Sequence, residues 1–227
     1  MTLRAGTTAA ITAVLVLVCA TMLVLRNDSS AEGGSAAQRC RRYAEQSRAR
    51  QEIVTGHGPS VAVIGDSYSV GRGLQHPAQA WPHELSGRLH VLGFSGSGFS
   101  RTASPCHRVA YYQRAGGALA THPDLIVVEG GLNDVGQPAA RVRAGFRRLM
   151  SELSGHRVVV VGPADAPRRA AGARSVDLLL RAECDRIHTP YISMIGHRFD
   201  YLPDRLHLTP ASHRTFGRDV AVGLEPS

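Results

Sequence analysis

Residues 60–69 read Ser-Val-Ala-Val-Ile-Gly-Asp-Ser-Tyr-Ser, an apolar run that ends at Gly65 and leads directly into Asp66 and Ser67. A short β-branched run bounded by glycine is typical of a strand buried on both faces. A helix that begins at the end of such a strand would expose the Ser67 hydroxyl and point its first N–H groups toward the same place. Taken alone, the segment favours a plainer interpretation, in which Asp66 and Ser67 cap a helix.

The rest of the chain repeats this alternation of short apolar runs and helical patterns. Further strands are expected at residues 90–92, 125–128, 158–161 and 191–194. Helices are expected at residues 79–89, 111–120, 139–153 and 175–188, and a last helix begins after Thr209 with Pro210 at its first position. Residues 163–174 are expected to form a mobile loop. This alternation predicts an α/β fold, a three-layer α/β/α sandwich around a central parallel sheet.

Three further segments carry chemistry in this plan. They read Gly-Phe-Ser-Gly-Ser-Gly at 93–98, Gly-Leu-Asn-Asp at 131–134 and Asp-Arg-Leu-His at 204–207. The first two follow predicted strands, as Ser67 does, and the third lies in the loop before the last helix. Ligands of open parallel sheets bind outside the carboxyl ends of the strands. One edge of the sheet could therefore gather all four segments, which together indicate acyl transfer through a serine.

Ser67, Asp204 and His207 have the chemistry of a nucleophile and its base. A serine hydroxyl is a weak nucleophile and needs a base beside it. In one tight turn, the Asp204 carboxylate could bind one imidazole nitrogen of His207 while the other nitrogen takes the Ser67 proton. Activity would then rise as pH passes about 6.5, with the midpoint raised by Asp204. With 11 histidines in the chain, an Asp-x-x-His pair can also arise by chance.

Asn133 and Gly96 could supply hydrogen-bond donors that carry no charge. The negative oxygen of a tetrahedral intermediate needs N–H groups that already point toward it, and an amide side chain and a glycine backbone can provide them. A turn at Asn133 and a flexible Gly-Ser loop are the plainer interpretations. The glycine spacing in residues 93–98 matches neither the dinucleotide fingerprint nor the P-loop, and the chain has no lysine.

The four segments together resemble the four blocks of the SGNH (GDSL-type) hydrolase family, over residues 60–223. Ala80-Trp81-Pro82, ahead of the second block, is similar to a helix start found in many extracytoplasmic bacterial members. The resemblance implies a flavodoxin-like three-layer fold and hydrolysis of carboxylic esters through an acyl-enzyme, with neither a cofactor nor a metal.

The resemblance also implies a role for each site residue. Ser67 would be the nucleophile, His207 the base and Asp204 the residue that orients the base. The oxyanion hole would consist of the Ser67 N–H, the Gly96 N–H and the Asn133 side chain. An asparagine that many members carry before the second block is absent here, so Gly98 remains an alternative to Gly96. Asp66 and Asp134 are expected to be structural and to tie loops together through backbone hydrogen bonds.

The expected function is that of an exported serine ester hydrolase, either esterase- or lipase-like or a carbohydrate deacylase. Two alternatives remain open. A glycan hydroxyl of the cell envelope could replace water as the acceptor, which would make the protein an acyltransferase, or the same fold could be a catalytically silent binding domain. The substrate would be a small-molecule, glycan or lipid ester. The net charge is +8, but no nucleic-acid motif accompanies it, and a monomer is expected.

The N-terminal region predicts export. Residues 9–25 form an uncharged, mainly apolar run. The run is short for a membrane span and long for the core of a signal peptide. Residues 1–26 are therefore either a signal peptide or a membrane anchor, which could tether the protein to a membrane. Residues 27–58 would form a polar linker and a short helix at 38–54 with a solvated arginine-rich face. Residues 59–227 would form the hydrolase domain.

Export would place the cysteines after this segment in an oxidising compartment, where disulfides form. Cys184 falls on the apolar stripe of the helix expected at 175–188, so it is expected to be a buried thiol. Cys40 and Cys106 both adjoin polar or turn residues, and a bond between them would be permitted there.

Overall fold

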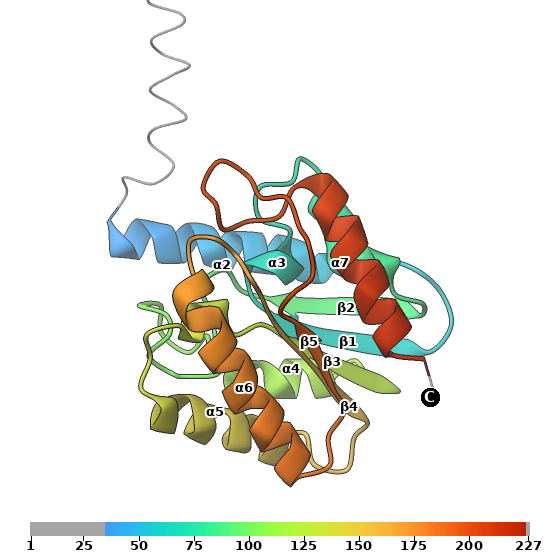
Figure 1. Cartoon of the computed structure of the whole chain (residues 1–227). Coiled ribbons are helices and arrows are strands. Elements are labelled where there is room, and N and C mark those ends of the chain that lie inside the picture. Colours follow the sequence, from blue (N-terminus) through green and yellow to red (C-terminus); the bar gives the residue numbers. More distant parts are fainter. Residues whose placement is uncertain (1–34, 226–227) are drawn as a thin grey trace, which may run out of the picture. The chain divides into compact units, whose positions relative to one another are not determined.

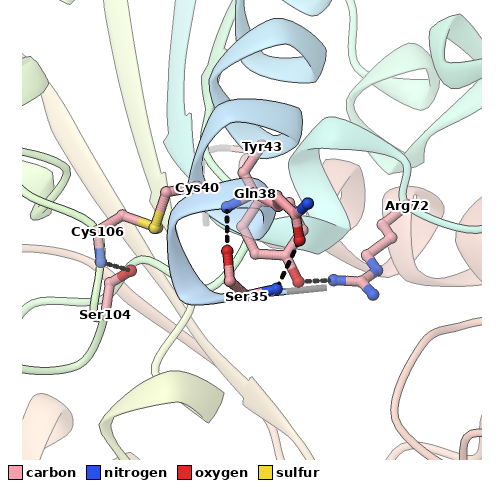
Figure 2. Close-up of a disulfide and its surroundings, with 7 residues drawn as sticks. All are labelled: Ser35, Gln38, Cys40, Tyr43, Arg72, Ser104 and Cys106. Carbon is pink, nitrogen blue, oxygen red and sulfur yellow. Dashed lines mark hydrogen bonds between the residues drawn. A yellow bond between two sulfur atoms is a disulfide. The ribbon is translucent and has the colours of Figure 1, made fainter. Parts of the chain in front are cut away.

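The computed structural model describes residues 35–225 (Figure 1). The chain divides into two compact units, one that ends at Arg39 and a second that comprises Cys40–Ser227. The described part of the first unit holds the start of helix α2 (Ala36–Glu52). There the Ser35 N–H donates to Oε1 of Gln38 at 2.7 Å, and the Gln38 N–H donates to Oγ of Ser35 at 3.3 Å (Figure 2). This reciprocal capping box explains where the predicted polar helix begins.

Five parallel strands form the sheet of the second unit, in the order β2-β1-β3-β4-β5. Their bounds are Ser60–Gly65 for β1, Arg88–Gly93 for β2, Leu125–Glu129 for β3, Val158–Ala164 for β4 and Tyr191–Met194 for β5. All five predicted strands are present, and the predicted three-layer α/β/α class is confirmed.

Helices cover both faces of the sheet, as Figure 1 shows. Ala62 and Ile64 of β1 pack on one face with the buried residues of α4 (Ala115–Leu119), α5 (Ala139–Glu152) and α6 (Ala170–Arg186). Val61 and Val63 point the other way and pack with α7 (Pro210–Gly223) and the 3₁₀ helix η2 (Trp81–Glu84). Because both faces of β1, β3 and β4 are covered, these inner strands are apolar at nearly every position.

Two of the sequence predictions between strands are wrong. The helix expected at 79–89 is instead two short 3₁₀ turns, η1 (Pro77–Gln79) and η2, and β2 already begins at Arg88. Pro82 limits helical hydrogen bonding, and Gly87, at φ +119°, ends the segment in a conformation that few other residues adopt. The loop expected at 163–174 is shortened from both sides by β4 and α6.

The helix expected at 111–120 is present in two parts, η3 (Tyr111–Arg114) and α4. The helices expected at 139–153 and 175–188 are α5 and α6, and α6 starts earlier than predicted. The cap of α7 is as predicted, because Oγ1 of Thr209 accepts the N–H of Ser212 at 3.2 Å.

A disulfide joins Cys40 of α2 to Cys106 (Figure 2), so the pairing left open by the sequence is formed. Cys184 is a free, buried thiol, as predicted. The expectation of a solvated arginine face on α2 is wrong in one respect, since Arg50 is only 1% exposed.

The apolar run at residues 9–25 lies outside the described residues. Within residues 35–225, no helix has the combination of length and apolar character that a membrane crossing requires.

Candidate active site

Ser67 lies at a sharp turn between β1 and the four-residue helix α3 (Ser67–Val70). Asp66 caps this helix, with its Oδ1 accepting the Tyr68 N–H at 2.9 Å. Gly65 leaves no room for a side chain, because a Cβ there would lie 2.0 Å from Oγ of Ser69. The capping interpretation is therefore correct for Asp66, and this cap fixes the turn on which Ser67 sits.

Asp204 organises the second half of the site. Its Oδ1 accepts the backbone N–H groups of Leu206 and His207 at 2.9 and 3.0 Å, so one carboxylate oxygen closes a tight turn. The Tyr68 hydroxyl donates to the Leu206 carbonyl at 2.6 Å, which ties this turn to α3. This bond holds two segments that are far apart in the chain in fixed positions relative to each other.

Ser67, His207 and Asp204 form one continuous chain of hydrogen bonds. Nε2 of His207 lies 3.1 Å from Oγ of Ser67, and Nδ1 of His207 lies 2.5 Å from Oδ2 of Asp204. Ser67 and His207 are 7% and 5% exposed, so the relay is largely shielded from bulk water. Such a chain can move the serine proton onto the imidazole while the carboxylate stabilises the resulting imidazolium.

Burial lowers the pKa of His207 below its ordinary value and outweighs the opposing hydrogen bond and charge of Asp204. The positive charges of Arg72 and Arg168 lower the pKa of His207 further. Asp204 acts to raise the pKa of His207, as expected, but burial has the larger effect, so the expectation of a net upward shift of the midpoint is wrong. Burial also acts to raise the pKa of Asp204, but hydrogen bonds from His207 and Leu206 hold that pKa below its ordinary value.

The two glycines proposed for the second segment lie in different environments. Gly96, at φ +78°, is partly exposed in an otherwise buried stretch from Val91 to Ser100. Gly98 is buried, and a Cβ on it would lie 2.5 Å from Oδ2 of Asp134. The same carboxylate accepts the N–H groups of Phe99 and Ser100 at 2.9 and 2.7 Å, the structural role predicted for Asp134. Gly98 is thus packed against Asp134, whereas Gly96 is partly exposed to solvent.

Asn133 links the first and second segments. Its Nδ2 donates to Oδ2 of Asp66 and to the Ser97 carbonyl, both at 2.9 Å. Both N–H groups of this amide are thus engaged within the protein. A substrate oxygen would have to share or displace the Ser97 carbonyl to receive one of them.

A buried cation underlies the same loops and was not singled out by the sequence patterns. The Arg114 guanidinium donates to the Gly65 carbonyl at 2.9 Å, to Oγ of Ser97 at 2.8 Å and to the Leu92 carbonyl. Burial lowers the pKa of Arg114 to about 10, so it stays charged at neutral pH. It ties the ends of β1 and β2 to the glycine loop. One arginine among 26, on a helix-like stretch, carries no sequence signal for this role.

Two buried carboxyl groups lie beside that cation. Burial raises the pKa of Asp66 to about 7, and it raises the pKa of Glu129 well above its ordinary value. Oε2 of Glu129 accepts the Ser69 hydroxyl at 2.6 Å, and Ser69 accepts Nε1–H of Trp81 at 3.1 Å. The strand end therefore rests on a dense polar network below the turn that carries Ser67.

Comparisons with known proteins agree with this fold. The sequence profile of the GDSL-like lipase/acylhydrolase family matches residues 63–215. The chain belongs to this family. It is accordingly a serine hydrolase that acts on carboxylic esters. Among curated proteins, none matches the chain.

Solved structures of similar fold are distant in sequence. A putative G-D-S-L lipolytic protein from Desulfitobacterium hafniense is 12% identical, with a TM-score of 0.61 over 74% of this chain and 100% of that one. Est24, a carbohydrate acetylesterase from Sinorhizobium meliloti, is 20% identical, with a TM-score of 0.58 over 73% and 97%. A family two carbohydrate esterase from Clostridium thermocellum, in complex with cellohexaose, is 14% identical, with a TM-score of 0.58 over 74% and 64%.

Proposed function

We propose that this esterase works through an acyl-enzyme on Ser67, with His207 as general base and Asp204 as the residue that orients it. The observation that carries the proposal is the unbroken hydrogen-bonded chain from Oγ of Ser67 through His207 to Oδ2 of Asp204. Its geometry suits transfer of the serine proton as the oxygen attacks an ester carbonyl.

The reaction proceeds in two halves. Oγ of Ser67 bonds to the carbonyl carbon while its proton passes to Nε2 of His207, and the carbonyl becomes an oxyanion. The alkoxide then leaves with that proton, and the acyl group remains on Ser67. In the second half, water gives its proton to His207 and attacks the acyl carbon, and the proton returns to Ser67 as the carboxylic acid leaves.

The oxyanion hole in this proposal is made by the N–H groups of Ser67 and Gly96 and by the Asn133 side chain. Exposure of Gly96 supports its choice over Gly98, which is buried against Asp134. The buried guanidinium of Arg114 supports the same loop from behind through the Ser97 hydroxyl. Donors held in place before reaction stabilise charge without reorganising.

The proposal includes an extracytoplasmic location, with residues 1–26 as the export signal or anchor. The disulfide between Cys40 and Cys106 supports it, because such bonds persist in oxidising compartments. The ester would be a small-molecule, glycan or lipid ester met outside the cytoplasm.

Steady-state hydrolysis of short-chain aryl esters tests the mechanism. Ser67→Ala should lower kcat by roughly 10⁴ to 10⁶, because the nucleophile and the relay act as a unit. Ser151→Ala, which changes an exposed serine in the last turn of α5, controls for general damage and should retain most activity. Near-normal turnover by Ser67→Ala would reject the proposal.

A further inference from the structure

Helix α2 brings residues to the site from outside the region that matches the family. From Cys40 onward it precedes residues 63–215, and the disulfide to Cys106 fixes it beside the loop that follows the second segment. Oγ of Ser47 donates to the Gly93 carbonyl at 2.6 Å, so the helix also bonds to the end of β2. Whatever α2 presents at this edge is therefore held in place by a covalent bond and a buried hydrogen bond.

Tyr43 of α2 lies beside the glycine assigned to the oxyanion hole. A Cβ on Gly96 would lie 3.8 Å from Cε2 of Tyr43. The Tyr43 ring also meets Phe94 edge to face, with centroids 6.3 Å apart. These contacts with Gly96 and Phe94 hold the Tyr43 ring next to the position where a substrate oxygen would bind.

Arg72 lies between the Tyr43 ring and the nucleophile and base. Its guanidinium donates to the Tyr43 hydroxyl (Figure 2), with Cζ 5.0 Å from the ring centroid. Its backbone N–H donates to the Ser67 carbonyl at 3.0 Å, which fixes it to the nucleophile turn. Its charge also acts on His207. Arg72 is thus close to both halves of the reacting site.

The positive charge of Arg72 has no carboxylate to balance it among the residues that the structure describes, since none forms an ion pair with it. Its one side-chain bond, to Tyr43, leaves further N–H donors available. A second cation, Arg168, acts on His207 as well. Asp204 is the nearby carboxylate of the relay, and it is already paired with His207. The rim of the site therefore carries excess positive charge.

We propose that Arg72, braced by Tyr43 on the disulfide-anchored helix α2, is a specificity-determining residue that selects esters bearing a carboxylate, phosphate or sulfate group near the scissile bond. This inference rests on the proposed function, since it concerns the same site. A planar guanidinium binds such anions through paired N–H donors, and charge-assisted bonds are stronger than neutral ones.

The test compares kcat/KM on two matched pairs of esters. 3-Carboxyphenyl acetate against phenyl acetate places the charge on the alcohol side, and 4-nitrophenyl hemisuccinate against 4-nitrophenyl butyrate places it on the acyl side. In at least one pair, the wild type should favour the charged ester by roughly tenfold, and added salt should weaken the preference. Arg72→Gln should abolish the preference, Tyr43→Phe should reduce it and Arg72→Lys should retain part of it.

Arg88→Gln is the matched control, because it makes the same change in net charge as Arg72→Gln. Arg88 is an exposed residue at the amino end of β2. The preference of this variant should equal that of the wild type. The inference is overturned if the wild type does not discriminate in either pair, if Arg72→Gln still discriminates, or if Arg88→Gln loses the preference equally. Failure to hydrolyse any of the four esters would instead reject the proposed function, and this inference with it.

Discussion

At the scale of single residues, the state of His207 controls the reaction. Only neutral imidazole accepts the serine proton, and burial lowers the pKa of His207 despite Asp204. We therefore expect kcat/KM to rise with pH and to reach its plateau before an unperturbed histidine would be fully neutral. A pH profile with a neutral ester measures this midpoint. A midpoint above the ordinary range for histidine would contradict the electrostatic account.

The charges that face His207 allow a sharper form of the same test. Asp204 favours its protonated form, whereas Arg72 and Arg168 disfavour it. Arg168→Gln should therefore move the midpoint of kcat/KM to higher pH. Arg88→Gln changes net charge far from the site and should leave the midpoint in place. Equal shifts in both variants would show that net charge, and not position, sets the midpoint.

Asn133 has a role that its hydrogen bonds make testable. Loss of one oxyanion donor usually lowers kcat by roughly 10² to 10³ with little change in KM, and Asn133→Ala should behave in this way. Asn133→Asp is the matched control for size, because it keeps the shape but replaces donors with acceptor oxygens. It should be at least as impaired as Asn133→Ala. A kcat unchanged in both variants would remove Asn133 from the oxyanion hole.

At this scale the sequence could predict Ser67, Asn133, Asp204 and His207 because each belongs to a short local motif. It could not predict Arg72, Tyr43 or Arg114. These residues act through contacts between distant segments, such as that of Tyr43 with Gly96, and a single arginine or tyrosine has no spacing that distinguishes it.

At the scale of elements, α5 owes its close approach to a glycine. A Cβ on Gly145 would lie 1.9 Å from the Phe99 carbonyl oxygen, in the loop that Asp134 holds. Gly145→Ala should therefore destabilise the fold by about 1–3 kcal/mol through overpacking. Gly116→Ala in α4 meets nothing within 4 Å and should be neutral or stabilising. Thermal unfolding of the two variants measures the difference, and equal melting temperatures would contradict this packing.

The disulfide between Cys40 and Cys106 also stabilises the position of an element, helix α2. It closes a loop between residues separated by 66 positions, for which chain entropy predicts a contribution of about 4 kcal/mol. Reductant should lower the denaturant midpoint of the wild type and have no effect on a variant with both Cys40→Ser and Cys106→Ser. An unchanged midpoint for the reduced wild type would show that α2 needs no covalent tie.

Elements were predictable where the periodic pattern was long or the strand continuously apolar. All five strands and α5 follow that rule. The segment 79–89 did not, because Trp81 is fully buried against Phe216 of α7, with ring centroids 5.5 Å apart. That tertiary contact favours a short 3₁₀ turn over the helix suggested by local composition.

At the scale of the whole molecule, buried carboxyl groups link stability to pH. The folded pKa of Asp66, about 7, lies above that of an unfolded aspartate, so the folded state binds more protons between the two values. This contribution to stability grows as pH falls toward 4 and is lost as pH rises through 7. His213 opposes it, because burial lowers its pKa to about 4 and stability is lost as pH falls below 6.5.

Comparison of the wild type with Asp66→Asn isolates the contribution of the Asp66 carboxyl group to the free energy of unfolding, because both proteins contain the same histidines. Relative to Asp66→Asn, the wild type should gain about 1 kcal/mol in unfolding free energy as pH falls from about 8.5 to 6.5. Chemical denaturation at both pH values measures this gain. A difference between the two proteins that does not change with pH would mean that Asp66 ionises normally in the fold.

The proposed mechanism requires an acyl-enzyme at Ser67, and a fluorophosphonate probe reports on this nucleophile. Intact mass measurement after labelling, followed by peptide mapping, should show one adduct on Ser67. Labelling should be absent from Ser67→Ala, strongly slowed in His207→Ala and unchanged in Ser151→Ala. An adduct on another residue, or full labelling of Ser67→Ala, would contradict the proposed mechanism.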